Sequence, residues 1–398
     1  MKLFNTLTQS LETFVPLDDT VRIYVCGVTP YDTTHLGHAF TYVSFDTLIR
    51  YLEFSGHKVK YVQNVTDIDD DVLRKSRELG MQWDELGRRE TARFLRDMDA
   101  LNVRRPDVYA KATEEIPNML PVIATLIERG YAYVSEGCVF YDVRHDPDFG
   151  VMPRAIGLED YYAMLTTANE HGNFPNDTRK RDPLDFVLWQ AQAPGEPAWE
   201  SPWGPGRPGW HIECSAMSIH HLGEQIDIHG GGADLAFPHH TCEIAQSEHY
   251  TELAPFARIW AHTGMVYQDG EKMSKSLGNL TLASNLLKVY SADAIRIVLQ
   301  SHHYRYPWEC FPEDLTNAAE TARIFQQLRE LVGATPASEL TEETTLLHNR
   351  FLAVMDDDLN TPEAVRMLRK AAQIALVANN VTLGSEVLRL TTVLGLYA

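Results

Sequence analysis

Hydrophobic runs in the first 65 residues predict a strand, a helix and a second strand. The run VRIYVCG, residues 21–27, is typical of a buried strand that ends in glycine. Apolar residues with helical spacing follow over about 37–54, and the run KVKYVQNV predicts a second strand ending at Val65. This order is typical of a parallel α/β sheet, in which ligands bind beyond the carboxyl ends of the strands. We therefore expect functional residues at those ends.

The rest of the chain shows three further patterns. Residues from about 84 to 129 have a charged helical pattern, and residues from about 136 to 189 are irregular and rich in Asp, Gly and Pro. Strand-like character returns in IDIHGGGADLAF and IWAHTGMVYQDG, and helical spacing continues from about Ser284 to the end. We expect an α/β catalytic domain over 1–288 with an insertion over about 105–190, followed by a C-terminal helical bundle over 289–398.

Composition narrows the class of protein. A chain of 398 residues with 44% hydrophobic residues can form two or three globular domains. Its formal net charge of -20 gives no general attraction for a phosphate backbone. Five cysteines are few for this length and argue against a disulfide framework. Because neither a signal peptide nor a long apolar span is visible, we expect a cytoplasmic protein without membrane contact.

Two motifs are suited to binding phosphate. His35-Leu36-Gly37-His38 opens the first predicted helix, where imidazole N–H groups and free backbone N–H groups can face an anion. Lys272-Met273-Ser274-Lys275-Ser276 carries two lysines that can neutralise a triphosphate. Each motif alone is also compatible with ordinary polar caps or a solvated turn. Their joint occurrence in this order favours a nucleotide site.

These two motifs resemble the signatures of the class I aminoacyl-adenylate-forming synthetases. The resemblance implies a Rossmann-like catalytic domain and attack by a substrate carboxylate on the α-phosphate of ATP. It implies that His35 and His38 stabilise the phosphoryl oxygens, that Lys272 and Lys275 hold the β- and γ-phosphates, and that Mg2+ accompanies ATP.

A glycine-rich turn and three separate pieces add further candidates. In Gly230-Gly231-Gly232-Ala233-Asp234 the glycines allow close approach of a nucleoside, and the acidic residue can accept hydrogen bonds from ribose. Metal-type ligands occur at Cys26, at Cys214 and in the run HHTCE, residues 239–243. Zinc distinguishes a thiolate from a hydroxyl, which pocket size alone cannot do. A Cys/Cys/His set with one open position is therefore suited to selecting cysteine.

The chain also resembles, over nearly its whole length, the cysteine-activating branch of that family. The similar segments include YVCGVTPYD, YVQNVTDIDDD, PGRPGWHIECSAM, GGGADLAFPHH, DGEKMSKSLGN and MDDDLNTP. The resemblance implies one Zn2+ held by Cys26, Cys214 and His239, with Glu243 at the position of a fourth ligand. It implies that the adenylate site is formed by Gly27, Thr29, Thr41, Asn64, Thr66, Trp210, Gly232, Asp234 and Val266.

Two relatives in this branch pass the activated cysteine to different acceptors. Cysteinyl-tRNA synthetases charge a tRNA, whereas the cysteine ligase of mycothiol biosynthesis acylates the amine of glucosaminyl-inositol. His38, the segment EHGNFP at residues 170–175, the run HTGMV and the end of the chain after the helical region favour the amino-sugar acceptor. No anticodon-binding domain is expected, and residues 289–398 carry 9 Lys plus Arg against 14 Asp plus Glu, which offers little attraction for tRNA.

Other segments favour the alternatives. The runs CEIAQSE and LFNTLT resemble the tRNA-charging enzymes, so transfer to tRNA(Cys) stays as the second hypothesis. A third possibility is a catalytically inactive paralogue that only binds nucleotide or a partner protein. The intact histidine and lysine motifs make this the weakest of the three. We expect L-cysteine, ATP and a small amino-sugar acceptor as the substrates.

Overall fold

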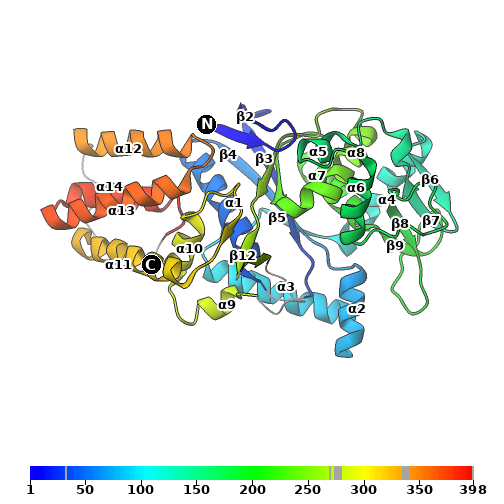
Figure 1. Ribbon diagram of the computed structural model, residues 1–398, viewed down its shortest axis with the longest axis horizontal. Coiled ribbons are helices and arrows are strands. Elements are labelled where there is room, and N and C mark those ends of the chain that lie inside the picture. Colours follow the sequence, from blue (N-terminus) through cyan, green and yellow to red (C-terminus); the bar gives the residue numbers. More distant parts are fainter. Residues whose placement is uncertain (32–33, 269, 273–279, 334–340, 397–398) are drawn as a thin grey trace.

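A five-stranded parallel sheet forms the centre of the protein (Figure 1), as the first hydrophobic runs predict. The computed structural model describes residues 1–31, 34–268, 270–272, 280–333 and 341–396, and of Lys272 the backbone alone. In spatial order, the strands are β11 (Ala257–Thr263), β10 (Ile226–Gly232), β3 (Thr20–Val28), β4 (Lys58–Val65) and β5 (Val108–Lys111). The chain runs from β3 outward through β4 and β5, then returns to the other side of β3 as β10 and β11. The edge between β3 and β10 is therefore a switch point, where α/β sheets bind ligands.

The two faces of the sheet bury separate hydrophobic cores because side chains alternate along each strand. On β3, Ile23 and Val25 contact the core that contains α1 (Leu36–Phe54) and α10 (Ala292–Gln300). Tyr24 and Cys26 point to the opposite core. That second core contains the helices α4 (Ala112–Glu128), α7 (Trp210–Leu222) and α8 (Thr241–Thr251). Strand alternation thus directs the Cys26 sulfur toward α7 and α8.

The segment expected to be irregular instead contains part of an antiparallel sheet. Its strands are β6 (Ala132–Ser135), β7 (Cys138–Tyr141), β8 (Phe186–Ala191) and β9 (Gly206–Pro208). Glu136 and Gly137 both have positive φ and form a two-residue turn between β6 and β7. Because these strands are only three to six residues long, their alternation gives a weak sequence signal.

The charged segment expected to be wholly helical also contains a strand. The helices α2 (Asp70–Leu79) and α3 (Trp83–Ala100) agree with the expectation, but β5 follows them and pairs in parallel with β4. This strand falls inside the range expected as an insertion, yet it belongs to the central sheet. The short helices of the segment after β7 are η1 (Val143–His145), α5 (Val151–Ala155) and α6 (Tyr161–Glu170).

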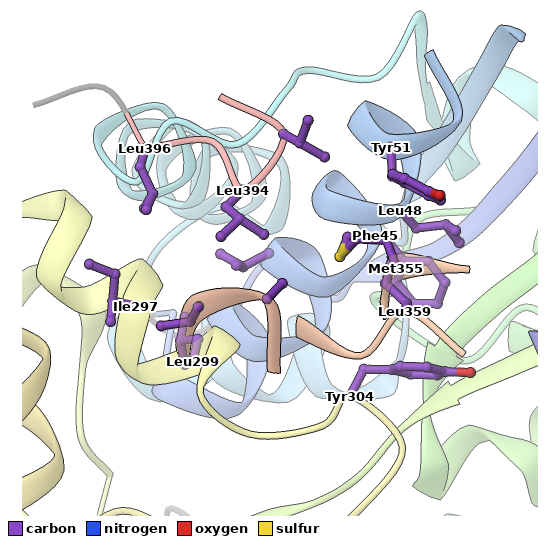
Figure 2. Close-up of a cluster of buried hydrophobic side chains, with 14 of the residues drawn as sticks. Phe45, Leu48, Tyr51, Ile297, Leu299, Tyr304, Met355, Leu359, Leu394 and Leu396 are labelled. Atoms are coloured by element: carbon purple, nitrogen blue, oxygen red, sulfur yellow. The ribbon is translucent and has the colours of Figure 1, made fainter. Parts of the chain in front are cut away.

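The C-terminal region is helical, as the apolar spacing predicts. Its helices are α9 (Ala283–Leu286), α10, α11 (Pro312–Val332), α12 (Glu342–Met355), α13 (Thr361–Ala378) and α14 (Val381–Thr391). Helices α11 to α14 lie together on the side of the sheet away from α7 and α8 (Figure 1). Their core is continuous with that of α1, because Phe45, Leu48, Met355 and Leu394 belong to one cluster of buried side chains (Figure 2).

A buried ion pair joins the C-terminal helices to α1 beside the central sheet. Arg296 on α10 contacts Asp46 on α1 at 2.5 Å, and both side chains are fully buried. Arg296 also donates hydrogen bonds to the carbonyl oxygens of Leu394 and Leu101. The guanidinium group thereby connects α1, α10 and the end of the chain.

Two small sheets complete the described structure. The N-terminal hairpin pairs β1 (Lys2–Asn5) with β2 (Ser10–Thr13). A three-stranded sheet consists of β13 (Glu271–Lys272), β12 (Val266–Gln268) and β14 (Trp308–Glu309). Within the described ranges, every helix is too short or too polar to cross a bilayer.

Candidate active site

A deep cleft of about 1280 Å³ opens at the carboxyl ends of β3, β10 and β11. The residues predicted from the sequence that line it are Cys26, Gly27, Thr29, His35, His38, Thr41, Trp210, Gly232, Asp234 and Val266. The remaining candidates with described side chains are buried in the adjoining interior: Asn64, Thr66, Cys214, His239 and Glu243. The structure therefore brings candidates from distant parts of the sequence to one place.

His35 and His38 lie at the start of α1, but the local geometry differs from the expectation. His35 is the N-cap residue, and its Nδ1 accepts hydrogen bonds from the backbone N–H groups of Gly37 at 3.1 Å and His38 at 3.4 Å. These two N–H groups are thus engaged by a side chain rather than free for an anion. A neutral His35 ring with Nδ1 as acceptor carries its proton on Nε2. The His35 and His38 rings stack with centroids 3.8 Å apart.

The lysine motif begins beside this helix start. The backbone of Lys272 pairs with Tyr267 in the β12–β13 hairpin, next to the cleft residue Val266. Lys275 lies outside the described residues, as does the Lys272 side chain. Beyond the motif, Leu282 pairs with His35 in a β-bridge, and Leu36 N–H donates to the Thr281 carbonyl at 2.8 Å. Both ends of the lysine segment are therefore anchored close to the two histidines.

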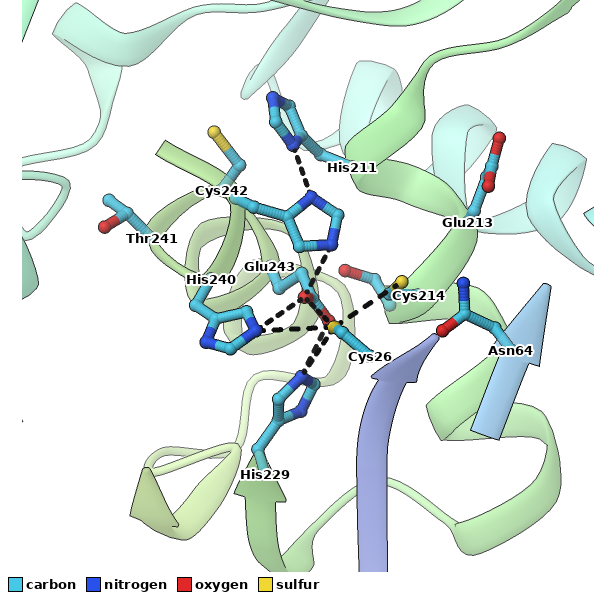
Figure 3. Close-up of polar contacts among 12 residues, drawn as sticks. Cys26, Asn64, His211, Glu213, Cys214, His229, His240, Thr241, Cys242 and Glu243 are labelled. Atoms are coloured by element: carbon cyan, nitrogen blue, oxygen red, sulfur yellow. Dashed lines mark hydrogen bonds and ion pairs between the residues drawn. The ribbon is translucent and has the colours of Figure 1, made fainter. Parts of the chain in front are cut away.

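Four buried metal-type ligands meet below the cleft (Figure 3). The ligand atoms of Cys26, Cys214, His239 and Glu243 all lie within 4.8 Å of one another. The two sulfur atoms are 3.8 Å apart, and His239 Nε2 is 3.2 Å from Glu243 Oε1. Cys26 comes from β3 and Cys214 from α7. His239 lies in the short helical segment η3 (Ala236–His240), and Glu243 follows it four residues later in α8.

A neighbouring imidazole holds His239 in place. His211 Nδ1 is 2.9 Å from His239 Nδ1, which leaves His239 Nε2 directed to the cluster. Metal-bound histidines usually have such a partner on the second ring nitrogen. The Trp210 ring also stacks on His239 with centroids 4.3 Å apart. The donor set, its burial and this support fit the sulfur, nitrogen and oxygen ligands that zinc takes in proteins.

Two further histidines lie at the cluster. His229 was not predicted, and His240 was predicted only as part of the metal-type run HHTCE. His229 Nε2 is 3.6 Å and His240 Nε2 is 3.3 Å from the Cys26 sulfur, and both belong to a second group of possible ligands with Cys26 and Glu243. A histidine in the predicted buried strand IDIHGGG, which ends at the cleft, was the available signal for His229. Another group, formed by Glu115, His220 and His221, is partly exposed and lies outside the cleft.

Burial controls the protonation of the cluster. It raises the pKa of the Cys26 thiol well above its usual value, and the adjacent Cys214 thiol raises it further. Burial also raises the pKa of Cys214 and lowers that of His239 well below its usual value. Neutral thiols and a neutral imidazole are thus favoured when the cluster holds no cation. A divalent cation has the opposite effect on thiols, because it stabilises the thiolate form.

The residues expected around the adenylate are joined by short contacts. Gly27 N–H donates to Asn64 Oδ1 at 2.6 Å, and a Cβ atom at Gly27 would lie 1.6 Å from the Asn64 carbonyl oxygen. Only glycine permits this approach of β3 to β4. The hydroxyl groups of Thr41 and Thr263 are 2.7 Å apart. Asn64 thus holds the backbone of Gly27, which lines the cleft, through a hydrogen bond from the adjoining strand. The glycines Gly230 to Gly232 form the end of β10 rather than a separate turn.

The buried imidazole of His262 leads to a prediction about pH. Burial, reinforced by His229, lowers the pKa of His262 to about 3. Below pH 6.5 His262 binds a proton in the unfolded chain, whereas in the folded state it stays neutral down to about pH 3. The free energy of unfolding should therefore fall by about 1.4 kcal/mol per pH unit from this group as the pH drops. Denaturant titrations of metal-free protein between pH 6.5 and 4 measure this slope.

The matched variants for this measurement are His262→Gln and His57→Gln. His57 is exposed after α1, so its replacement should leave the slope unchanged. His262→Gln should reduce the slope by the contribution of one proton. Equal slopes in all three proteins would show that His262 takes up its proton equally in the folded and unfolded states.

Comparisons with known proteins identify the family. A family model described as "tRNA synthetases class I (C) catalytic domain" matches residues 13–320. The chain is 45% identical over 366 residues to a protein from Dehalococcoides mccartyi named cysteine--tRNA ligase, covering 92% of this chain and 78% of that protein. It is 47% identical over 359 residues to the L-cysteine:1D-myo-inositol 2-amino-2-deoxy-alpha-D-glucopyranoside ligase of Thermomonospora curvata, covering 90% and 84%. The chain belongs to the class I cysteine-activating synthetases. This synthetase is therefore an ATP-dependent cysteine ligase.

The fold agrees with this membership. The synthetase superimposes on the Mycobacterium tuberculosis methionyl-tRNA synthetase in complex with methionyl-adenylate with a TM-score of 0.65. The match covers 95% of this chain and 90% of that structure at 14% identity. At that identity the likeness establishes the fold alone. It confirms the predicted Rossmann-like class I architecture.

Proposed function

We propose that this cysteine ligase converts L-cysteine and ATP into cysteinyl-adenylate and pyrophosphate, and then transfers cysteine to tRNA. A carboxylate oxygen of cysteine forms a bond to the α-phosphorus of ATP, while the bond from that phosphorus to the pyrophosphate oxygen breaks. One observation carries the proposal: buried thiol-selecting ligands lie beside a cleft whose rim carries the two stacked histidines.

The sulfur end of the substrate determines which amino acid is accepted. Cys26, Cys214, His239 and Glu243 would hold one Zn2+, which supplies a site that prefers a thiolate to a hydroxyl. Serine has nearly the shape of cysteine, so a pocket of the right size could not exclude it strongly. The His211 contact to His239 keeps the ligand set aligned.

The nucleotide would lie above this point in the cleft. His35 Nε2–H is suited to donating to a phosphoryl oxygen, and His38 is stacked beside it. Lys272 and Lys275 would neutralise the leaving pyrophosphate together with Mg2+. The remaining cleft residues would surround the nucleoside and the ribose, with Asp234 as the acceptor for ribose hydroxyls.

The comparisons favour tRNA as the acceptor more than the amino sugar that the sequence analysis expected. Relatives named cysteine--tRNA ligase include proteins from Dehalococcoides mccartyi and from Escherichia coli, the latter 43% identical over 407 residues. The amino-sugar ligase of Thermomonospora curvata, at 47% identity, keeps that acceptor as a second candidate. The segment 170–175, one of the features that favoured the amino-sugar hypothesis, lines the same cleft as Trp210. A small acceptor at that place would contact it directly.

One assay with two acceptors tests the whole proposal. Purified enzyme receives radiolabelled cysteine and ATP, and then either total tRNA or glucosaminyl-inositol. We expect AMP release and labelled cysteine in acid-precipitable tRNA, removed by mild base as an ester should be. If the amino sugar forms a labelled amide and the tRNA stays uncharged, the acceptor is glucosaminyl-inositol and not tRNA. Absence of cysteine-dependent pyrophosphate exchange would indicate an inactive paralogue and refute both.

A further inference from the structure

A carboxyl group adjoining the cleft has one oxygen without a partner. Glu213 is fully buried on α7, next to the predicted zinc ligand Cys214. Its Oε2 accepts a hydrogen bond from the Thr66 hydroxyl at 2.8 Å, but its Oε1 finds no donor among the described residues. Buried carboxyl oxygens are costly to leave unpaired, and such groups commonly receive a ligand or an ion. Glu213 also belongs to the cleft lining.

The position of Glu213 restricts what that ligand can be. In cysteine the sulfur and the amino nitrogen are separated by three bonds, so they lie about 3 to 4 Å apart, depending on the rotamer. A cysteine whose sulfur is held between Cys26 and Cys214 must therefore keep its α-ammonium group close to these residues. Glu243 belongs to the ligand cluster. Glu213, the residue before Cys214 on α7, combines burial, a place in the cleft lining and an oxygen without a donor among the described residues, which suits it to an ammonium group.

Thr66 completes the same subsite. Its N–H donates to the Val28 carbonyl at 3.2 Å, which fixes Thr66 beside the end of β3. Its hydroxyl donates to Glu213, and its oxygen accepts a hydrogen bond from Asn64 Nδ2 at 3.3 Å. A hydroxyl oxygen has two lone pairs, so one acceptor position remains for a ligand. In Figure 3, Asn64, Cys214 and Glu213 all lie on the same side of Cys26.

We propose that Glu213, together with the Thr66 hydroxyl, binds the α-ammonium group of the substrate amino acid. This inference rests on the proposed activation of cysteine. The metal site recognises sulfur, which other small thiols also offer. Glu213 would require in addition a primary ammonium group beside it, so the two sites together would recognise a β-thiol α-amino acid.

A pair of ligands separates this role from a structural one. Cysteine and 3-mercaptopropionate share the thiol and the carboxylate, but only cysteine has the ammonium group. Dissociation constants are measured by calorimetry on zinc-loaded protein. We expect Glu213→Gln to weaken cysteine binding by about tenfold to a hundredfold, the range for a hydrogen bond to a charged group. Binding of 3-mercaptopropionate should change less than about twofold. Equal weakening of both ligands, or of neither, would overturn the assignment.

Matched variants keep the test decisive. Glu196→Gln removes another carboxylate that lines the cleft, but one paired with Arg77 and Arg207, and should leave the ratio of the two constants unchanged. If Glu213→Gln does not fold, Thr66→Val and Thr66→Ser replace it: only the valine variant should lose the preference for cysteine.

Pyrophosphate exchange by the wild-type enzyme is measured in parallel. Absence of exchange refutes the proposed function. Normal exchange refutes this inference alone if the ratio of the two dissociation constants, for cysteine and for 3-mercaptopropionate, is unchanged in the variants.

Discussion

Replacing Cys214 by serine is expected to remove bound zinc and cysteine activation together. The sulfur of Cys214 lies 3.8 Å from that of Cys26 in a buried cluster, and a serine hydroxyl is a much poorer zinc ligand than a thiolate. Mutation of a residue that only hydrogen-bonds to a metal ligand typically lowers metal affinity or activity by about tenfold to a hundredfold. Loss of a ligand should therefore lower cysteine-dependent pyrophosphate exchange by more than about a hundredfold. Metal analysis and exchange rates on the same preparation measure both effects.

The chain offers a close control for this variant. Cys242 is equally buried and precedes Glu243 on α8, but it belongs to neither of the ligand groups around Cys26. Cys242→Ser should keep the metal and most of the activity. Circular dichroism must show that both variants fold. Normal zinc content in Cys214→Ser would contradict the assignment of this cluster.

The second large effect is expected from the phosphate-binding motifs. His38→Ala or Lys275→Ala should lower the rate of adenylate formation by about a hundredfold to a thousandfold, with a modest change in ATP affinity. These groups would stabilise charge that develops as pyrophosphate leaves, so their contribution appears mainly in the transition state. Single-turnover measurements of adenylate formation separate the rate from the ATP dissociation constant.

Two surface variants control for general effects of these substitutions. His57 follows the far end of α1, and Lys288 is an exposed lysine after the motif. His57→Ala and Lys288→Ala should leave both constants unchanged. A large loss of ATP affinity at an unchanged rate in His38→Ala would indicate ground-state binding instead of catalysis.

The metal cluster illustrates how far chemistry can be read from a sequence. Cys26, Cys214, His239 and Glu243 were predicted from residue type and resemblance, and the structure brings their ligand atoms together. His229 and His240 were not predicted as neighbours of the Cys26 sulfur, although both lie within 3.6 Å of it. Histidine in a buried strand or helix has many structural uses, so its position along the chain does not show which side chain it faces.

The histidine motif was found from the sequence, but its geometry was predicted wrongly. Free backbone N–H groups at the start of α1 were expected to face an anion. In the structure, His35 uses its own Nδ1 to cap the N–H groups of Gly37 and His38. The motif therefore forms a structural cap, and a neutral His35 ring in this arrangement carries its proton on Nε2. Which nitrogen faces which group depends on side-chain torsions that residue identity leaves open.

Long periodic elements were determined by the sequence itself. The strand around residues 21–27, the helix α1 and the C-terminal helices follow from hydrophobic periodicity, because each buries a whole face. The short strands β5 to β9 became evident only in the structure, because segments of three to six residues form strands only when a neighbouring strand supplies hydrogen-bond partners. The contact of Glu213 with Thr66 likewise depends on the packing of α7 against β4. The sequence thus specified which chemical groups are present, and tertiary packing decided which of them meet.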